Sequence, residues 1–164
     1  MLRLSLFILF IILTFTGCTR DDICPEDTTT TPLLVIDFRD NSDRELTKAV
    51  ESLLIYVNNS DSTLITAEAI NDTIVSIPLN TEADISSFLF ESNSASEDEN
   101  NFDSVSFNYS REEVYFNRAC GFKVNYNNLF VDVEEETTGN WILETEISNT
   151  TIDNENEVHL TIYH

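Results

Sequence analysis

Apolar and polar residues alternate along short segments of the chain, and polar stretches rich in Asn and Asp separate these segments. Residues 105–109 are the clearest case, because Val, Phe and Tyr alternate there with Ser and Asn. Alternation with a period of two is typical of β-strands that bury one face. Similar segments occur at residues 33–38, 53–57, 75–79, 88–90, 114–116, 123–126, 129–133, 141–147 and 158–163. Helical periodicity is almost absent, although residues 43–53 leave room for one turn or a short helix.

Short strands separated by polar turns predict an all-β fold, an antiparallel β-sandwich of about eight strands with immunoglobulin-like or transthyretin-like connections. Pro78 has no backbone N–H, so its segment should be an edge strand or the end of a strand. The alternation also assigns side chains to faces. Trp141 and Leu143 are predicted to face the core, and His159 is predicted to face solvent.

The N-terminal residues predict export through a signal peptide. A short basic start that ends at Arg3 precedes an apolar run from Leu4 to Thr16. This run is too short to span a bilayer as a helix, which needs ~20 residues, and its length is typical of the core of a signal peptide. We therefore predict a signal peptide over residues 1–17.

Residues 15–18, Phe-Thr-Gly-Cys, resemble a bacterial lipobox. In lipoproteins the signal peptidase cleaves before the cysteine, here Cys18, whose thiol carries a diacylglycerol. Phe15 stands where Leu is usual, and an ordinary secretory signal is the alternative. Each buried lipid methylene stabilises membrane attachment by ~0.8 kcal/mol, so the mature chain would be anchored without crossing the membrane. Residues 18–32 would form a lipidated tether, and residues 33–164 the β-sandwich domain.

The chain has three cysteines, an odd number for an exported protein. If Cys18 is lipidated, Cys24 and Cys120 remain as a pair, and an oxidising compartment would preserve their disulfide. Two free thiols are the alternative. A bridge that closes about a hundred residues would stabilise the fold by ~4–5 kcal/mol in the chain-entropy model.

The formal net charge of the chain is −22, from 8 basic and 30 acidic side chains. Because 41% of the residues are hydrophobic, the charge does not imply disorder. An acidic surface repels nucleic acid, whose binding depends on Lys and Arg contacts with phosphates, so no nucleic-acid partner is expected. The same charge disfavours docking on anionic lipid.

Motifs for catalysis and for cofactors are mostly missing. The three glycines form neither a phosphate-binding loop nor a Gly-x-Ser-x-Gly elbow. A glycosidase needs two positioned carboxylates, one with a raised pKa, and with thirty acidic residues such pairs arise by chance. Residues 97–103 and 153–157 could supply oxygens to calcium but lack the central glycine of an EF-hand loop. We therefore expect solvated acidic loops, no cofactor, and no catalytic or metal-binding residues.

Aromatic residues occur on both faces of the predicted strands. Tyr115, Phe130 and Tyr163 alternate away from the expected core faces. An exposed aromatic patch at these positions would bind glycan or protein. Ordinary packing is the alternative.

Several longer stretches resemble one protein family. They are RDDIC at residues 20–24, TTTTPLLVIDFRD at residues 28–40, RACGF at residues 118–122 within residues 107–129, and ISNTTIDNENEVHLTIYH at residues 147–164. The chain resembles the DUF6452 family, uncharacterised lipoproteins of Flavobacteriia and related Bacteroidota. The resemblance implies a lipoprotein signal, a small β-rich domain and cysteines at the places of Cys24 and Cys120. It also implies a candidate partner, a small outer-membrane β-barrel protein.

Two short patterns gain meaning from this resemblance. Arg20, Asp21 and Asp22 resemble the signal that sends Bacteroidota lipoproteins to the outer face of the outer membrane, with the periplasmic face as the alternative. Four Asp-Ser/Thr motifs resemble Bacteroidota O-glycosylation sites. Their acceptor residues would be Thr28, Ser62, Thr73 and Ser104.

The sequence therefore predicts a non-enzymatic lipoprotein of the cell envelope, anchored in the outer membrane through its N-terminal lipid, with its β-sandwich as a binding or scaffolding module. A hydrolase that acts on envelope glycans through an acid pair is the first alternative. A calcium-dependent binding module is the second.

Overall fold

The computed structural model describes residues 23–26, 28–98, 100–137 and 139–164. These residues form eight strands, and none of them belongs to a helix that is long and apolar enough to cross a membrane. The strands are β1 (Leu34–Arg39), β2 (Leu54–Val57), β3 (Ile74–Ile77), β4 (Ile85–Ser92), β5 (Asn101–Asn117), β6 (Gly121–Val133), β7 (Glu144–Ile147) and β8 (Leu160–Tyr163). The prediction of an all-β fold of about eight strands is confirmed.

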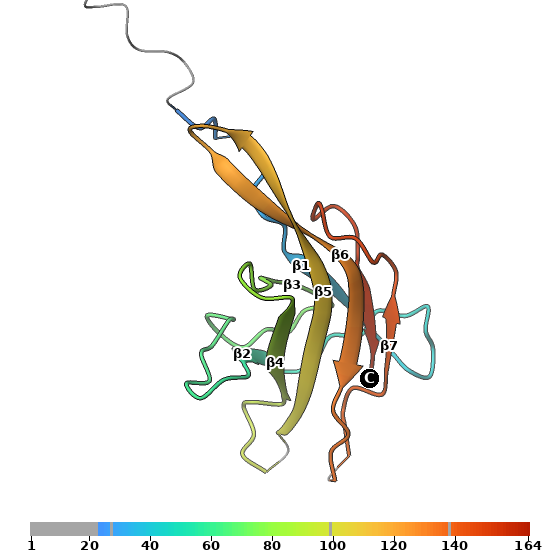
Figure 1. The fold of residues 1–164 in the computed structure, drawn as a ribbon. Helices are drawn as coiled ribbons and strands as arrows, with labels where there is room; N and C mark the ends of the chain where they lie inside the picture. The colour runs from blue at the N-terminus through green and yellow to red at the C-terminus, as the bar shows by residue number, and fades with distance from the viewer. Residues whose placement is uncertain (1–22, 27, 99, 138) are drawn as a thin grey trace, which may run out of the picture. The chain divides into compact units, whose positions relative to one another are not determined.

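Two four-stranded sheets make up the β-sandwich (Figure 1). One sheet has the order β3-β1-β8-β7 and the other has the order β2-β4-β5-β6. The pairs β1–β3, β2–β4, β4–β5 and β7–β8 are antiparallel, whereas β1 and β8 are parallel. Strand β3 lies at a sheet edge and Pro78 follows it directly, which confirms the position predicted from the missing N–H. The choice between immunoglobulin-like and transthyretin-like connections stays a prediction.

Strands from opposite ends of the chain meet at the centre of the first sheet. Strand β8 runs parallel to β1, with Ile36 opposite Leu160 and Phe38 opposite Ile162. All four of these side chains are fully buried. The last strand of the chain therefore joins the first inside one sheet, so it is part of the core.

The core lies between the two sheets and is filled from the alternate positions that the pattern predicts. Phe88 and Phe90 of β4 pack there with Val105 and Phe107 of β5. The rings of Phe88 and Phe107 are 5.8 Å apart. Burying a large apolar side chain stabilises a fold by ~1.5–3 kcal/mol, so these alternate positions account for much of the stability.

The chain separates into two compact units. The first contains, among the described residues, 23–26 and 28–30 together with Val114–Lys123. The second contains Thr31–Glu113 and Val124–His164, and the hydrophobic core belongs to it.

Three details of the strands differ from the prediction. Strands β5 and β6 are continuous over 17 and 13 residues, whereas the pattern divided each of them in two. Residues 110–113 are all exposed polar residues, so no alternation marks the strand where it runs through them. The described residues 43–53 contain turns and no helix.

Residues 141–147 show the third difference. Strand β7 begins only at Glu144, and Leu143 is 59% exposed while Ile142 is buried. The backbone N–H of Ile142 donates to Oδ2 of Asp103 at 2.7 Å, and this bond turns Ile142 toward the core. Leu143 was therefore assigned to the wrong face, whereas Trp141 packs against the core as predicted.

His159 does not face solvent, contrary to the prediction from alternation. Its side chain has no exposed surface, and its Nδ1 accepts a hydrogen bond from the backbone N–H of Val35 at 3.1 Å. A ring nitrogen that accepts a hydrogen bond is unprotonated, so the ring is neutral with its proton on Nε2. Burial lowers the pKa of His159.

Tyr163 is also buried, although it lies on the outer face of its strand. The guanidinium of Arg44 lies 4.6 Å from the centre of its ring, and its hydroxyl donates to Glu146 at 2.8 Å. Strand β8 is thus covered on both faces. The other two aromatic residues assigned to outer faces, Tyr115 and Phe130, are 57% and 59% exposed.

Candidate functional site

A surface hollow of about 480 Å3 is a candidate binding site in the second unit. It lies where β2, β3 and β4 end or begin. Its lining residues are Val57, Asn58, Asn59, Ile65, Pro78, Leu79, Asn80, Ile85, Ser86, Ser87 and Phe88. None of these described lining residues has an ionisable side chain, so the hollow offers apolar surface with a few amide and hydroxyl groups.

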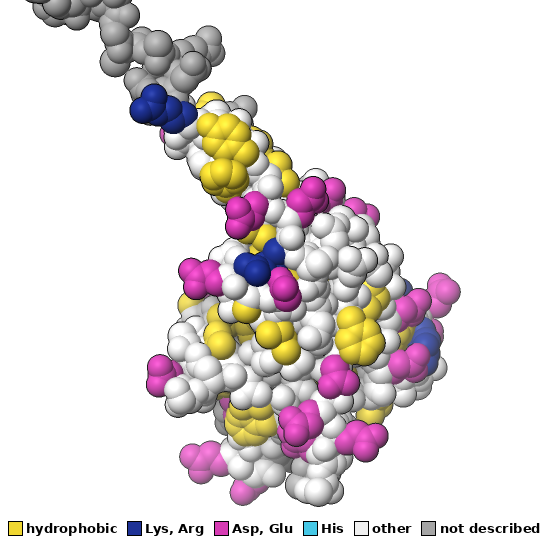
Figure 2. All heavy atoms as spheres, viewed as in Figure 1, with side chains coloured by type: hydrophobic (Ala, Val, Ile, Leu, Met, Phe, Trp, Pro, Cys, Tyr) yellow, Lys and Arg dark blue, Asp and Glu magenta, His cyan; other side chains and the backbone are white. Residues whose placement is uncertain are grey.

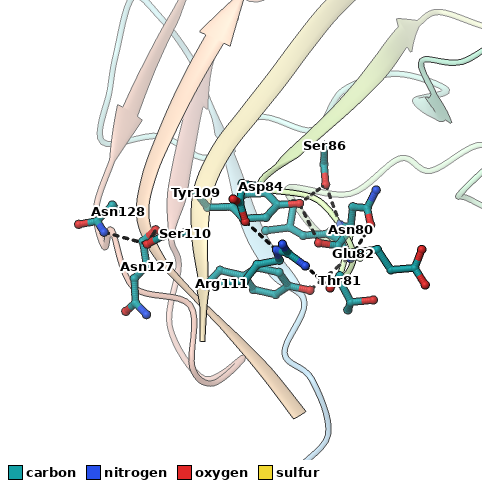
Figure 3. A network of polar contacts seen from close by, with 12 residues as sticks. Asn80, Thr81, Glu82, Asp84, Ser86, Tyr109, Ser110, Arg111, Asn127 and Asn128 are labelled. Carbon is teal, nitrogen blue, oxygen red and sulfur yellow. Dashed lines mark hydrogen bonds and ion pairs between the residues drawn. The ribbon is translucent and has the colours of Figure 1, made fainter. Parts of the chain in front are cut away.

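The polar groups at one side of this hollow form a closed cycle of hydrogen bonds (Figure 3). The N–H of Asn80 donates to Oγ of Ser86 at 2.7 Å, and the hydroxyl of Tyr109 donates to the carbonyl of Asn80 at 3.0 Å. Oγ of Ser86 lies 2.6 Å from the hydroxyl oxygen of Tyr109 and donates to it, which closes the cycle. The hydroxyl of Ser86 is therefore occupied by structural bonds, and none of the described lining residues is a His that could activate it as a nucleophile.

Neighbouring side chains hold this cycle in place. Nε of Arg111 pairs with Asp84 at 2.6 Å, and its Nη1 donates to the carbonyl of Thr81 at 2.8 Å. The ring of Tyr126 packs edge-on against Tyr109 at 4.9 Å, and burial raises the pKa of Tyr126 to about 12. Both tyrosines therefore stay protonated at neutral pH, and the arrangement fixes the turn between β3 and β4.

A second hollow, of about 290 Å3, contains the other histidine. The Nε2 of His164 lies 3.1 Å from the carbonyl oxygen of Lys48, and its ring packs edge-on against Phe38 and Trp141. Because a carbonyl only accepts, Nε2 carries the proton. Burial lowers the pKa of His164.

The acid pair required by the hydrolase alternative has one candidate member, Asp103. Burial raises the pKa of this carboxyl group. However, Asp103 has no exposed surface and its Oδ2 accepts from the N–H of Ile142. It does not line the larger hollow. A sugar has no access to this carboxyl group in the structure, so Asp103 holds the chain before β7 rather than a substrate.

The acidic loops do not assemble a metal site within the described residues. No group of three or more His, Cys, Asp or Glu side chains is placed there to hold a metal ion. In residues 153–157, Nδ2 of Asn154 donates to Asp153 at 2.8 Å, and Oε1 of Glu155 accepts from the N–H of Leu33 at 3.0 Å. Calcium binding stays a prediction for calorimetry to test.

In the first unit, a tight turn joins the ends of β5 and β6. We call residues 114–123 the hairpin end. Oδ1 of Asn117 accepts from the N–H groups of Ala119 and Cys120 at 2.9 and 2.8 Å. Gly121 follows with a φ of 72°, a conformation that glycine adopts without strain. The sequence Asn-Arg-Ala-Cys-Gly therefore encodes this turn locally.

A disulfide joins Cys24 to Cys120 in the hairpin end. The bond was predicted from the cysteine count, and the structure contains it. Oγ1 of Thr28 lies 3.6 Å from the sulfur of Cys120, so the segment after Cys24 also contacts the turn. The bridge attaches the N-terminal segment to the hairpin end ten residues before β1 begins.

The remaining predicted site residues have different environments. Cys18, Arg20, Asp21 and Asp22 lie outside the described residues. Ser62 is exposed in a turn, whereas Thr28 and Thr73 are half-buried. Ser104 lies inside β5, where its Oγ accepts from Nδ2 of Asn58 at 3.0 Å. Ser62 is therefore the most accessible of the four predicted acceptors.

Sequence reasoning missed the hollow and the Tyr109–Ser86–Asn80 cycle. These residues come from β5, β4 and the turn after β3, and each is an ordinary strand or turn residue in the local pattern. Only the pairing of β4 with β5 brings Ser86 opposite Phe107, two positions from Tyr109. No local signal marks such a site.

The model of a family described as "Family of unknown function (DUF6452)" matches residues 52–164. No curated protein matches the chain, and no solved structure matches it either.

Proposed function

We propose that this chain, which belongs to the DUF6452 family, is a lipid-anchored protein of the cell envelope whose β-sandwich binds or scaffolds a partner without catalysis. The mature chain would begin at lipidated Cys18. It would be held at the outer membrane, with display on the cell surface favoured over the periplasmic face by Arg20, Asp21 and Asp22.

The Cys24–Cys120 disulfide is the observation that carries this proposal. Disulfides persist in oxidising compartments outside the cytosol, so the bond supports export. It also uses two of the three cysteines, which leaves Cys18 in the lipobox-like sequence as the remaining thiol. Both consequences agree with a lipoprotein signal at residues 1–17.

The character of the larger hollow supports binding rather than catalysis. Its described lining has no group that could act as a general acid or base, and Ser86 is fully hydrogen-bonded. Apolar hollows with a few polar groups are typical binding sites for ligands or peptide segments.

Mass spectrometry of the mature protein from membranes tests the lipoprotein part. We expect an N-terminal peptide that begins at Cys18 and carries a diacylglycerol. The Cys18→Ser variant should appear in the soluble fraction with its Cys24–Cys120 bond intact. Wild-type protein with an unmodified Cys18 would contradict the proposal.

Crosslinking in intact cells, followed by capture through the lipoprotein, tests the scaffolding part. A reproducible partner is expected, and an outer-membrane β-barrel protein is the candidate. Protease treatment of intact cells tests location, because a chain cleaved only after lysis does not lie on the cell surface. A protein recovered without any crosslinked partner would refute scaffolding.

A further inference from the structure

The hairpin end, residues 114–123, carries exposed aromatic rings, and hydrophobic side chains gather there on the face that Figure 2 shows. The ring centres of Tyr115 and Phe122 lie 5.0 Å apart, so the two rings pack together. Tyr115 nevertheless remains 57% exposed and Phe122 64% exposed. Phe116 follows Tyr115 in the strand and so projects to the other face, where it is 38% exposed. A sheet face that docks on a protein needs apolar residues on one side only. Rings on both sides favour a medium that surrounds the hairpin end, such as a lipid bilayer.

The charge of the hairpin end differs from that of the whole chain. No Asp or Glu occurs between Glu113 and Asp132, although the net charge of the protein is −22. Arg118 lies in the turn, and Nζ of Lys123 lies 5.9 Å from the centre of the Phe116 ring. Aromatic rings beside Lys and Arg are typical of segments that sit at the headgroup level of a bilayer. The repulsion expected between this acidic protein and anionic lipid therefore does not extend to the hairpin end.

The Cys24–Cys120 bond limits how far the hairpin end is from the site of lipidation. Cys24 lies six positions after Cys18. A fully extended chain covers at most ~3.6 Å per residue, so the two Cα atoms are at most ~22 Å apart. Ile23, which precedes the bridged cysteine, is 77% exposed and adds apolar surface beside it. A tether this short gives the hairpin end a high effective concentration at the membrane surface.

We propose that the hairpin end inserts Tyr115, Phe116 and Phe122 into the headgroup region of the bilayer that holds the lipidated Cys18. This inference rests on the proposed lipid anchor and adds a second contact with the same membrane. The disulfide serves this contact, because it keeps the aromatic hairpin end beside the anchor.

Quenching of tryptophan fluorescence by brominated lipids tests the contact. The full lipidated protein is reconstituted into vesicles of phosphatidylethanolamine and phosphatidylglycerol, with or without bromine on the acyl chains. Two variants are compared with the wild type, whose Trp141 supplies the background signal. Phe122→Trp places a probe in the hairpin end. Phe130→Trp is the matched control, since Phe130 is an equally exposed aromatic residue of β6 in the second unit.

We expect brominated lipid to reduce the added fluorescence of Phe122→Trp and its emission to shift to the blue, with neither change in Phe130→Trp. Equal quenching of both variants, or no quenching of either, would overturn the inference. A blue shift seen only in native membranes and absent from protein-free vesicles would also overturn it, because a protein partner would then cover the rings. The mass of the same samples reports the anchor separately. Lipidated Cys18 without quenching refutes only the contact, whereas unmodified Cys18 refutes the proposed function as well.

Discussion

Removal of the Cys24–Cys120 disulfide is the perturbation for which the structure gives the clearest range of outcomes. The bond joins residues separated by 96 positions. In the chain-entropy model, a loop of this length stabilises the folded state by ~4.7 kcal/mol. That value assumes that the N-terminal segment keeps its folded position when the bond is absent.

The contacts of this segment indicate a smaller loss. Most of the described residues from 23 to 30 are exposed, and Thr31, where the second unit begins, accepts at its Oγ1 from the N–H of Val124 at 3.0 Å. If the segment detaches up to Thr31, a path of about 11 residues still joins the two cysteines in the folded protein. The free energy of closing the full loop exceeds that of closing this shorter one by ~2 kcal/mol, which is 1.5RT times the logarithm of the ratio of the two lengths. Removal of the bond should therefore lower the free energy of unfolding by about this amount.

The assay is urea unfolding followed by the fluorescence of Trp141. All proteins carry Cys18→Ser to keep them free of lipid, and the double variant Cys24→Ser with Cys120→Ser is compared with the bridged form. A loss of ~2 kcal/mol lowers the midpoint by ~1 M urea for a typical slope of ~2 kcal/mol/M. A loss above ~4 kcal/mol would show that the segment stays docked without the bond. An unchanged midpoint would refute the loop-closure argument itself.

Three further predictions concern the second unit. Tyr109→Phe removes the hydroxyl from the cycle with Ser86 and should lower the free energy of unfolding by ~1–3 kcal/mol in urea, because its buried partners lose their hydrogen bonds. The control Tyr115→Phe changes an exposed residue and should alter the free energy of unfolding by less than ~0.5 kcal/mol. Equal losses in the two variants would refute a stabilising role for the cycle. Burial lowers the pKa of His159, so the unfolded chain binds more protons, and the free energy of unfolding should fall as the pH drops below the unfolded value of 6.5. In urea unfolding at about pH 7.5 and about pH 5.5, the free energy of unfolding should fall less in His159→Asn than in the wild type. Equal falls in the two proteins would contradict the role of His159 in this pH dependence. Ile162→Ala should lower the free energy of unfolding by ~2–5 kcal/mol in the same assay, since the side chain is fully buried, and a loss below ~1 kcal/mol would mean that β8 is not part of the core.

The sequence by itself determined features that depend on neighbouring residues. Alternation placed Val105, Phe107 and Tyr109 on one buried face, because side chains along a strand point to opposite sides in turn. Pro78 marked a sheet edge because it has no N–H to donate. With Cys18 assigned to the lipobox-like sequence, the cysteine count predicted a Cys24–Cys120 bond, which the structure contains.

Only the tertiary structure decided which faces are covered. Alternation assumes that one face of each strand meets solvent, but β8 lies between β1 and β7 and is buried on both faces. His159 is therefore inside, hydrogen-bonded to Val35, and Tyr163 lies beneath Arg44. The residues that cover β8 come from distant parts of the chain, and no local pattern records them.

The hairpin end and the larger hollow differ in the same way, because the first depends on neighbouring residues and the second on distant ones. The turn of the hairpin end is encoded by five consecutive residues, and the rings of Tyr115 and Phe122 are exposed close to it in sequence. The hollow and the Tyr109–Ser86–Asn80 cycle depend instead on the register between β4 and β5 and on the turn after β3. Register is a property of paired strands, because a shift of one residue would exchange every inward side chain for an outward one.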